Sequence, residues 1–222
     1  MDIPKINFSY KRNKYIFKNL EIKSFYDYNI TAFCGHNGVG KTTLLKILAG
    51  IYPYDNKTKK ILYDSKWFIG SNRSGLINNL SLNDHLNLLI DLIKADKSII
   101  DFLIDKFELR EFMDNEVFEL SDGQFIKGAL LLAIVCSPEN LFLDEVFSSL
   151  DYISQTVVID ELIKLRKTTN IVLVSHNLDI ISQIAKRIII LKNGKIEFDS
   201  ILDERFEEIS ATKLKEIYLE RA

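Results

Sequence analysis

Cysteine and long apolar runs are both scarce in this sequence. Its two cysteines, Cys34 and Cys136, fit neither a metal-binding nor a redox spacing. Each ends an apolar run, which favours buried free thiols in a reducing compartment over a disulfide. The longest unbroken apolar run, residues 129–136, is far shorter than the roughly 18 residues of a membrane-spanning helix. Because the first residues are polar and lack the apolar segment of a signal peptide, we expect a soluble chain.

A large excess of one charge sign is missing as well. The chain has 29 Lys/Arg and 31 Asp/Glu, so it lacks the basic footprint of a nucleic-acid-binding protein, and we expect no nucleic-acid partner. The charge is nevertheless uneven: residues 1–75 carry 13 Lys/Arg against 5 Asp/Glu, whereas residues 101–222 carry 14 against 23. Solvated faces that happen to differ explain this as well as a basic N-terminal part facing an anionic ligand or a partner.

The order of the predicted elements indicates an α/β fold. The sequence has no internal repeat or low-complexity linker, and its 222 residues suffice for one core but not for two full domains. We predict strands at 3–10, 15–22, 29–34, 59–63, 66–70, 141–143, 171–174 and 188–191, and a last strand after the Asn193-Gly194 turn. Helical spacing predicts helices at 41–49, 82–109, 121–136, 152–167 and 177–185, and an amphipathic tail at 203–221. Alternating strands and helices predict parallel strands with crossover helices.

A glycine-rich turn carries the strongest chemical signal. Residues 35–42 read GHNGVGKT, a full match to the P-loop pattern, between a predicted strand and a predicted helix. Its glycines let successive amides point inward at a helix N-terminus and bind phosphate, although a glycine turn without a ligand is the alternative. Lys41 is expected to reach the β- and γ-phosphates of ATP, and the Thr42 hydroxyl to ligate Mg²⁺. The residues expected to bind ATP here are Gly35, Asn37, Gly38, Gly40, Lys41, Thr42 and Thr43.

A second signal is the acid pair that ends the apolar segment LFLDE at residues 141–145. An all-apolar strand is typical of a parallel sheet covered on both faces, and ligands bind at the carboxyl ends of such strands. We expect Asp144 to hold Mg²⁺, directly or through water, and Glu145 to polarise the attacking water. Alone the pair is a weak signal, because many helices begin with acids at a strand end.

The segment LSDGQ at residues 120–124 narrows the family. It lies ahead of a predicted helix, and Gln124 precedes Asp144 by 20 positions. Here the sequence resembles the nucleotide-binding subunits of ATP-binding-cassette (ABC) transporters, whose signature is Leu-Ser-Gly-Gly-Gln followed by an apolar strand that ends in Asp-Glu. Further matches run along nearly the whole chain: SSLD at 148–151 resembles the D-loop, Ser175-His176 the switch histidine, GHNGVGKTTLLKILAGI the extended P-loop, and LKEIYL at 214–219 the ends of exporter-type subunits.

The resemblance implies a head-to-tail dimer in which the P-loop of one subunit and the signature of the other enclose each ATP. Ser121 and Gly123 would then contact the γ-phosphate from the second subunit, and Gln124 and Asp151 are expected to belong to the same ATP-binding site. His176 would contact the γ-phosphate or the attacking water. A local alternative for Ser121-x-x-Gln124 is a capping box that starts its helix, and both roles are compatible.

The family also stacks an aromatic residue on adenine. By position Tyr10 fits best and Tyr15 is its rival, while simple packing of tyrosines in short strands is the alternative for both.

Three departures from the family pattern stand out. Asp122 replaces a signature glycine and brings negative charge towards ATP, although an acid is tolerated in a first helical turn. Val146 replaces the usual proline after the acid pair. The glutamine that the family places after the strand at 66–70, where it contacts Mg²⁺, is missing, and Asn72 is the nearest chemical substitute; an ordinary surface turn is the alternative.

The prediction is therefore an α/β P-loop core with an N-terminal antiparallel β part and an inserted α-helical subdomain. Residues 1–75 and 137–222 would form the nucleotide-binding core and 76–136 the helical subdomain with the signature. The expected function is ATP hydrolysis coupled to transport, by a cytoplasmic subunit held at the inner face of the membrane by transmembrane permease subunits. It would pair with a second nucleotide-binding subunit, as a homo- or heterodimer, and be exporter-like. Rival interpretations are a soluble ABC ATPase acting on ribosomes or DNA, and a regulatory cassette with low turnover.

Overall fold

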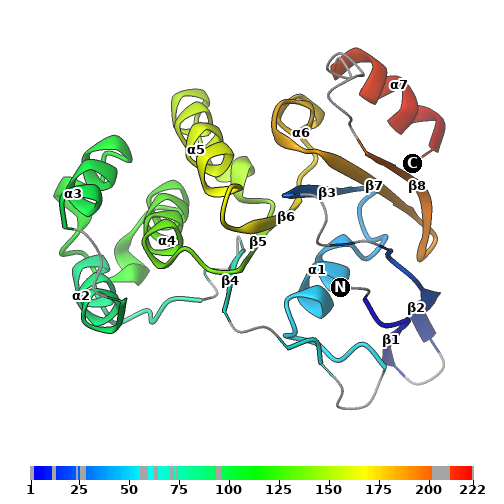
Figure 1. The fold of residues 1–222 in the computed structure, drawn as a ribbon, viewed down its shortest axis with the longest axis horizontal. Coiled ribbons are helices and arrows are strands. Elements are labelled where there is room, and N and C mark those ends of the chain that lie inside the picture. Colours follow the sequence, from blue (N-terminus) through cyan, green and yellow to red (C-terminus); the bar gives the residue numbers. More distant parts are fainter. Residues whose placement is uncertain are drawn as a thin grey trace.

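A six-stranded sheet with helices on both faces organises the molecule (Figure 1). The computed structural model describes residues 3–11, 14–23, 25, 29–55, 60–62, 65–70, 73, 75–93, 97–201 and 211–221. In spatial order the strands are β4 (Lys66–Gly70), β5 (Asn140–Asp144), β6 (Asn170–Val174), β3 (Ile30–Cys34), β7 (Arg187–Lys192) and β8 (Lys195–Ile201). All neighbouring pairs are parallel except β7 and β8. A separate antiparallel pair consists of β1 (Ile6–Lys11) and β2 (Lys14–Leu20).

The helices fall into two groups. The first group belongs to the sheet layers and includes the C-terminal helix: α1 (Lys41–Leu48), α5 (Tyr152–Leu165), α6 (Leu178–Ile184) and α7 (Ala211–Arg221), with the short 3-10 helix η3 (Val146–Ser149). Those that gather beyond the β4 edge, at the left of Figure 1, are α2 (Leu82–Ile93), α3 (Lys97–Lys106) and α4 (Asp122–Cys136), with η1 (Arg110–Phe112) and η2 (Val117–Glu119). Among the described residues, no helix combines the length and the apolar character that crossing a bilayer requires.

The sheet separates two hydrophobic cores. Every residue of β3 and β5 is buried, as expected for strands covered on both faces. Because successive side chains of a strand point to opposite faces, Phe142 packs with α1 and the β1–β2 pair. Its neighbours Leu141 and Leu143 pack instead with α4 and α5. The apolar run before the acid pair therefore holds both layers, and it fixes where β5 delivers Asp144.

The predicted fold class is confirmed, and two local predictions change. A strand was expected at 59–63, but residues 60–62 form none. Ile61 is buried while Leu62 is 81% exposed. Only the first of these two apolar side chains packs into the core, and residues 60–62 pair with no strand in the described structure. The helical periodicity from 82 to 109 corresponds to two helices, α2 and α3, and the second ends at Lys106. The division into core and helical subdomain stays a prediction.

Candidate functional site

The P-loop turns sharply between β3 and α1, and two of its glycines are required by close approach. Gly35 has φ +142°, and a Cβ there would lie 2.5 Å from the carbonyl oxygen of Leu191. Gly40 has φ +106°, and a Cβ there would lie 2.8 Å from the ring of Phe17. Since Gly40 is followed directly by α1, the first amides of this helix, which have no intrahelical acceptors, face the loop.

Lys41 lies at the base of this loop. Its side chain is almost fully buried, and Nζ donates hydrogen bonds to the carbonyl oxygens of Gly35 at 2.8 Å and His36 at 3.0 Å. Burial lowers the pKa of Lys41, and the nearby carboxylates of Glu145 and Asp144 act in the opposite direction. A buried ammonium held by neutral carbonyls gains from a nearby anion, so the geometry fits a phosphate.

Thr42 and Asp144 bring together two oxygen donors from distant parts of the chain. Thr42 Oγ1, on α1, donates to Asp144 Oδ1, at the end of β5, at 2.9 Å. Burial raises the pKa of Asp144, while the Thr42 hydrogen bond and the charges of Lys46 and Lys41 lower it. Hard cations such as Mg²⁺ prefer oxygen ligands. No group of three or more His, Cys, Asp or Glu in the described part of the chain could hold a metal, so Mg²⁺ here would need oxygens from phosphate or water as well.

Glu145 and His176 meet next to this pair. Glu145 Oε1 lies 3.1 Å from His176 Nε2, and the His176 amide donates to Glu145 Oε2 at 3.3 Å. The Nε2–Oε1 contact is close but is not a hydrogen bond, so Oε1 is a buried acceptor with no hydrogen-bond donor among the described residues. A buried acceptor gains from a donor, and the His176 ring nitrogen is the nearby group that could supply one. Glu145 also lines a pocket at the place where the acid pair was expected to act.

Lys41, Thr42, Glu145 and His176 line one pocket of about 360 Å³, the P-loop pocket, whereas Gly35 and Asp144 are not among its lining residues. Its lining residues are Tyr10, Ile16, Asn37, Gly38, Gly40, Lys41, Thr42, Thr43, Glu145 and His176. Tyr10 is 60% exposed, and its hydroxyl lies 2.9 Å from Thr43 Oγ1. Its rival Tyr15 is not among the lining residues. The structure therefore brings Tyr10, rather than Tyr15, to the pocket; that its ring stacks on adenine stays a prediction.

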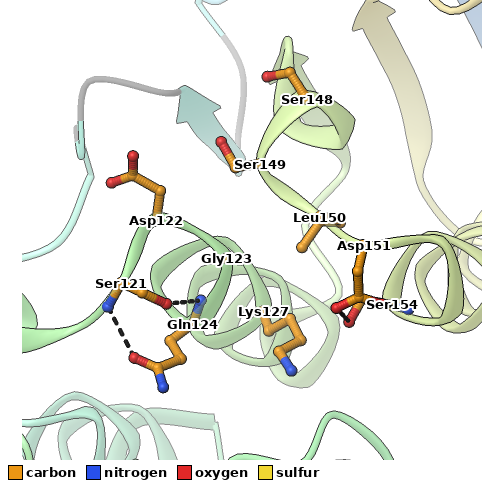
Figure 2. Close-up of a pocket in the computed structure, with 10 residues that line it drawn as sticks. All are labelled: Ser121, Asp122, Gly123, Gln124, Lys127, Ser148, Ser149, Leu150, Asp151 and Ser154. Carbon is orange, nitrogen blue, oxygen red and sulfur yellow. Dashed lines mark hydrogen bonds between the residues drawn. The ribbon is translucent and has the colours of Figure 1, made fainter.

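The signature residues line a different pocket, of about 670 Å³ (Figure 2). Ser121 caps α4: its Oγ accepts from the Gln124 amide at 3.2 Å, and Gln124 Oε1 accepts from the Ser121 amide at 2.8 Å. The predicted capping box is therefore present, and the phosphate role of Ser121 stays a prediction. Asp151 caps α5 and accepts from the Ser154 amide at 2.9 Å, which lowers its pKa. A Cβ at Gly123 would lie 2.9 Å from the Ser149 carbonyl oxygen, so α4 and the D-loop are in close contact.

The two pockets share no lining residue. The P-loop pocket lies where α1 meets the ends of β5 and β6. The signature pocket lies between the starts of α4 and α5. In one chain, therefore, the residues predicted to bind the same γ-phosphate form two separate sites.

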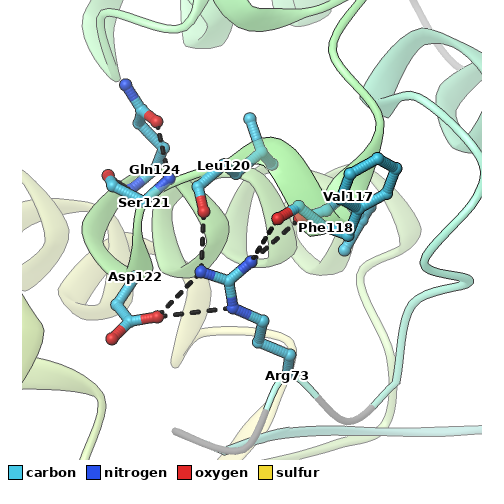
Figure 3. Close-up of polar contacts among 7 residues, drawn as sticks. All are labelled: Arg73, Val117, Phe118, Leu120, Ser121, Asp122 and Gln124. Carbon is cyan, nitrogen blue, oxygen red and sulfur yellow. Dashed lines mark hydrogen bonds and ion pairs between the residues drawn. The ribbon is translucent and has the colours of Figure 1, made fainter.

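The loop after β4 gives one untested prediction and one unexpected contact. Asn72, the predicted substitute for the missing glutamine, lies outside the described residues. Its neighbour Arg73 extends to Asp122 and to the backbone before the signature (Figure 3). Sequence reasoning missed this arginine: both charged residues are visible in the sequence, but they are 49 positions apart and no local pattern pairs them.

Residues 18–148 match the sequence model of a family described as ABC transporter. The match covers more than half of the chain and includes the P-loop, the signature and the acid pair. The chain belongs to the ABC transporter family. This confirms the predicted family, and it supports the predicted class of function, an ATP-binding and ATP-hydrolysing transporter subunit.

Characterised and uncharacterised ABC proteins are similar to this chain. An uncharacterized ABC transporter ATP-binding protein of Methanocaldococcus jannaschii is 30% identical over 175 residues, covering 77% of this chain and 66% of the relative. The energy-coupling factor transporter ATP-binding protein EcfA1 of Fusobacterium nucleatum is 28% identical over 230 residues, covering 94% and 84%. ABC transporter A family member 11 of Dictyostelium discoideum is 32% identical over 182 residues, but the match spans only 22% of that longer protein.

Solved ABC structures share the fold. The ATP-binding subunit of an ABC transporter superposes with a TM-score of 0.79 at 19% identity, covering 99% of this chain and 98% of the other. A dimeric ATP-binding cassette bound to ADP and phosphate gives 0.75 at 22% identity, covering 91% and 98%. At these identities the likeness supports the fold, and the site roles rest on the residues described above.

Proposed function

We propose that this ABC protein hydrolyses ATP at the interface of two nucleotide-binding subunits arranged head to tail. The observation that carries the proposal is the separation of the two phosphate-facing pockets, which share no lining residue. In a head-to-tail dimer the P-loop pocket of one chain faces the signature pocket of the other. Each ATP then contacts both pockets, and closure of the dimer depends on ATP.

Within the P-loop pocket, each residue has a distinct role. The loop amides and Lys41 bind the β- and γ-phosphates, and the ring of Tyr10 stacks on adenine. Thr42 and Asp144 would hold Mg²⁺, which would offset the negative charge of the phosphates. Glu145, which lines this pocket, accepts the proton of the attacking water, and His176, whose Nε2 lies 3.1 Å from Glu145 Oε1, orients water and γ-phosphate.

From the opposite side, the start of α4 completes the site. A helix N-terminus attracts anions, and here it presents the Ser121 hydroxyl and the amide of Gly123 to the γ-phosphate of the other subunit. Gln124 holds Ser121 by the capping box, and Asp151 fixes the D-loop that packs beside Gly123. Capping and phosphate contact are compatible, since Ser121 retains its hydroxyl proton for donation.

We also propose the setting in which this site works. Residues 76–136 form the helical subdomain that presents the signature, inserted into the nucleotide-binding core of residues 1–75 and 137–222. Transmembrane permease subunits hold the chain at the cytoplasmic face of the membrane, and dimer closure drives their conformational change. The exporter-like assignment is part of this proposal, and the cargo is chosen by the membrane subunits.

Glu145→Gln tests the proposed function most directly. Removing the proton acceptor should lower turnover by about 10²-fold or more, because general bases contribute on this scale, while ATP binding persists and an ATP-bound dimer accumulates. Steady-state phosphate release and sedimentation with ATP measure the two effects. Glu139→Gln, an exposed acid before the opposite end of the β5 run, is the matched control and should behave as wild type.

Two outcomes would contradict parts of the proposal. Near-normal turnover of Glu145→Gln would show that another group is the base. A wild-type chain that binds ATP but does not turn it over, even with its membrane subunits, would favour a regulatory cassette instead.

A further inference from the structure

Arg73 joins the loop after β4 to the segment that carries the signature (Figure 3). Its guanidinium makes five hydrogen bonds to residues 117–122, at the start of α4 and just before it. A guanidinium carries N–H donors on all three nitrogens in a fixed fork, and here each of the three nitrogens donates. Bonds from all three nitrogens of a fixed fork hold its orientation more strongly than a single exposed ion pair would.

Three of these bonds hold the backbone immediately before the signature. Nη1 donates to the carbonyl oxygens of Val117 and Phe118, each at 3.2 Å, and Nη2 donates to that of Leu120 at 2.6 Å. These residues form η2 and its C-terminal cap, and the next residue is Ser121. The position of Arg73 is therefore coupled to the position of the α4 N-terminus.

The other two bonds go to Asp122, the residue that departs from the family signature. Nε and Nη2 donate to Asp122 Oδ1 at 3.3 Å and 3.0 Å. The Asp122 side chain is 66% exposed and lines the signature pocket between Ser121 and Gly123. Without a cation beside it, this carboxylate would repel the triphosphate that the pocket is proposed to meet. The Arg73 Cζ atom also lies 5.9 Å from the centre of the ring of Phe125, which is on α4 with Asp122.

We propose that Arg73 is a positioning residue for the composite ATP site. It offsets the charge of Asp122 and fixes the carbonyls before Ser121, so that the start of α4 accepts the phosphate of ATP bound to the second subunit. This inference rests on the proposed head-to-tail dimer. Arg73 and Asp122 form a compensating pair: the positive charge of the arginine offsets the negative charge that Asp122 adds to the signature.

A double-mutant cycle in the Glu145→Gln chain tests the pair, because that chain is expected to accumulate the ATP-bound dimer. Arg73→Ala should weaken ATP-dependent dimerisation by about tenfold or more, since it exposes an uncompensated carboxylate to the triphosphate. In an Asp122→Gly background no charge needs to be offset and the same change removes only the carbonyl bonds, so it should weaken the dimer less, by about threefold. Analytical ultracentrifugation at saturating ATP gives the dissociation constants.

Two measurements separate positioning from general destabilisation. Binding of a fluorescent ATP analogue to the monomer reports the P-loop pocket alone and should not change in any variant. The control Arg110→Ala removes an exposed guanidinium that pairs with Asp101 and Asp105 in the helical part, and it should leave dimerisation unchanged. Arg73→Lys keeps a positive charge beside Asp122 and should weaken the dimer by at most about threefold, which also provides a milder variant if the alanine chain does not fold.

Three outcomes would overturn the inference. Unchanged dimerisation in Arg73→Ala would show that the contact is dispensable. An equal loss with and without Asp122, or a lysine variant as weak as the alanine variant, would show that offsetting Asp122 is not its role. Absence of an ATP-dependent dimer in the parent Glu145→Gln chain would instead refute the proposed function, and this inference with it.

Discussion

The P-loop pocket and the signature pocket of this chain are built in opposite ways. In the first, Lys41 is buried and Thr42 is bonded to Asp144 from a distant strand. In the second, Ser121 and Gln124 are bonded mainly to each other, and the surface stays open. The first pocket is shaped by the core of a single chain. The second, as proposed, is positioned by Arg73 and completed only by ATP on another subunit.

Mixing two defective chains tests this contrast with the largest expected effect. Lys41→Ala removes the buried cation of the first pocket, and Ser121→Arg fills the second, so each chain alone should lose nearly all ATPase activity. A mixed dimer retains one composite site formed by the intact P-loop of one chain and the intact signature of the other. Phosphate release should therefore return in part on mixing, with a maximum near equal amounts.

The mixture is informative only if both chains fold and associate. Circular dichroism and sedimentation of each variant are the controls. No recovery from folded chains that form mixed dimers would show that the two pockets do not share ATP.

Tyr10 offers a smaller effect, confined to the first pocket. Base–aromatic stacking contributes about 1–3 kcal/mol, so Tyr10→Ala should raise the KM for ATP by about tenfold and leave kcat nearly unchanged. Tyr10→Phe keeps the ring, loses only the contact with Thr43, and should change KM less than about threefold. Tyr15→Ala, across the β1–β2 pair from Ser9, is the matched control; a larger effect there would reverse the assignment.

The smallest expected effect concerns Asn72, which lies outside the described residues. If its amide oxygen approaches Mg²⁺, Asn72→Ala should leave ATP affinity nearly intact, because the P-loop dominates binding, and should reduce ATPase stimulated by the membrane subunits. Basal and stimulated turnover of this variant, with Asn72→Gln beside it, measure the effect. Unchanged stimulation in Asn72→Ala would leave this loop as ordinary surface.

Much of the fold was predictable because its signals are local. The apolar run within β5 and the glycine turn before α1 each specify their structure within a few residues, and the predicted limits of β5 and α1 differ from the observed ones by at most one position. The strand predicted at 59–63 was wrong for residues 60–62, because a strand also needs a neighbouring strand to pair with, and apolar content does not reveal one.

In the candidate site, too, local motifs were predictable and contacts between distant segments were not. Motifs predicted that Lys41, Asp144 and Glu145 share one site, because ligands bind at the carboxyl ends of parallel strands. They did not reveal the bonds of Arg73 to Asp122, which depend on how two loops far apart in sequence meet in space. The same limit left Tyr10 and Tyr15 as rivals until the β1–β2 pair placed one of them at the pocket.

The backbone of Glu145 restricts which changes this position tolerates. Its φ is +55°, a left-handed conformation that is rare outside glycine and poor for β-branched residues. The turn is held at both sides, since the Glu145 amide donates to the Val174 carbonyl at 3.0 Å and Ser148 Oγ donates to the Glu145 carbonyl at 2.6 Å. A single-base or engineered change to Gln or Asp thus alters chemistry within an unchanged turn, whereas a change to Val also alters the turn. Of these changes, Gln removes the carboxylate while it keeps the shape of the side chain, so a subunit can lose its proton acceptor here and keep the turn.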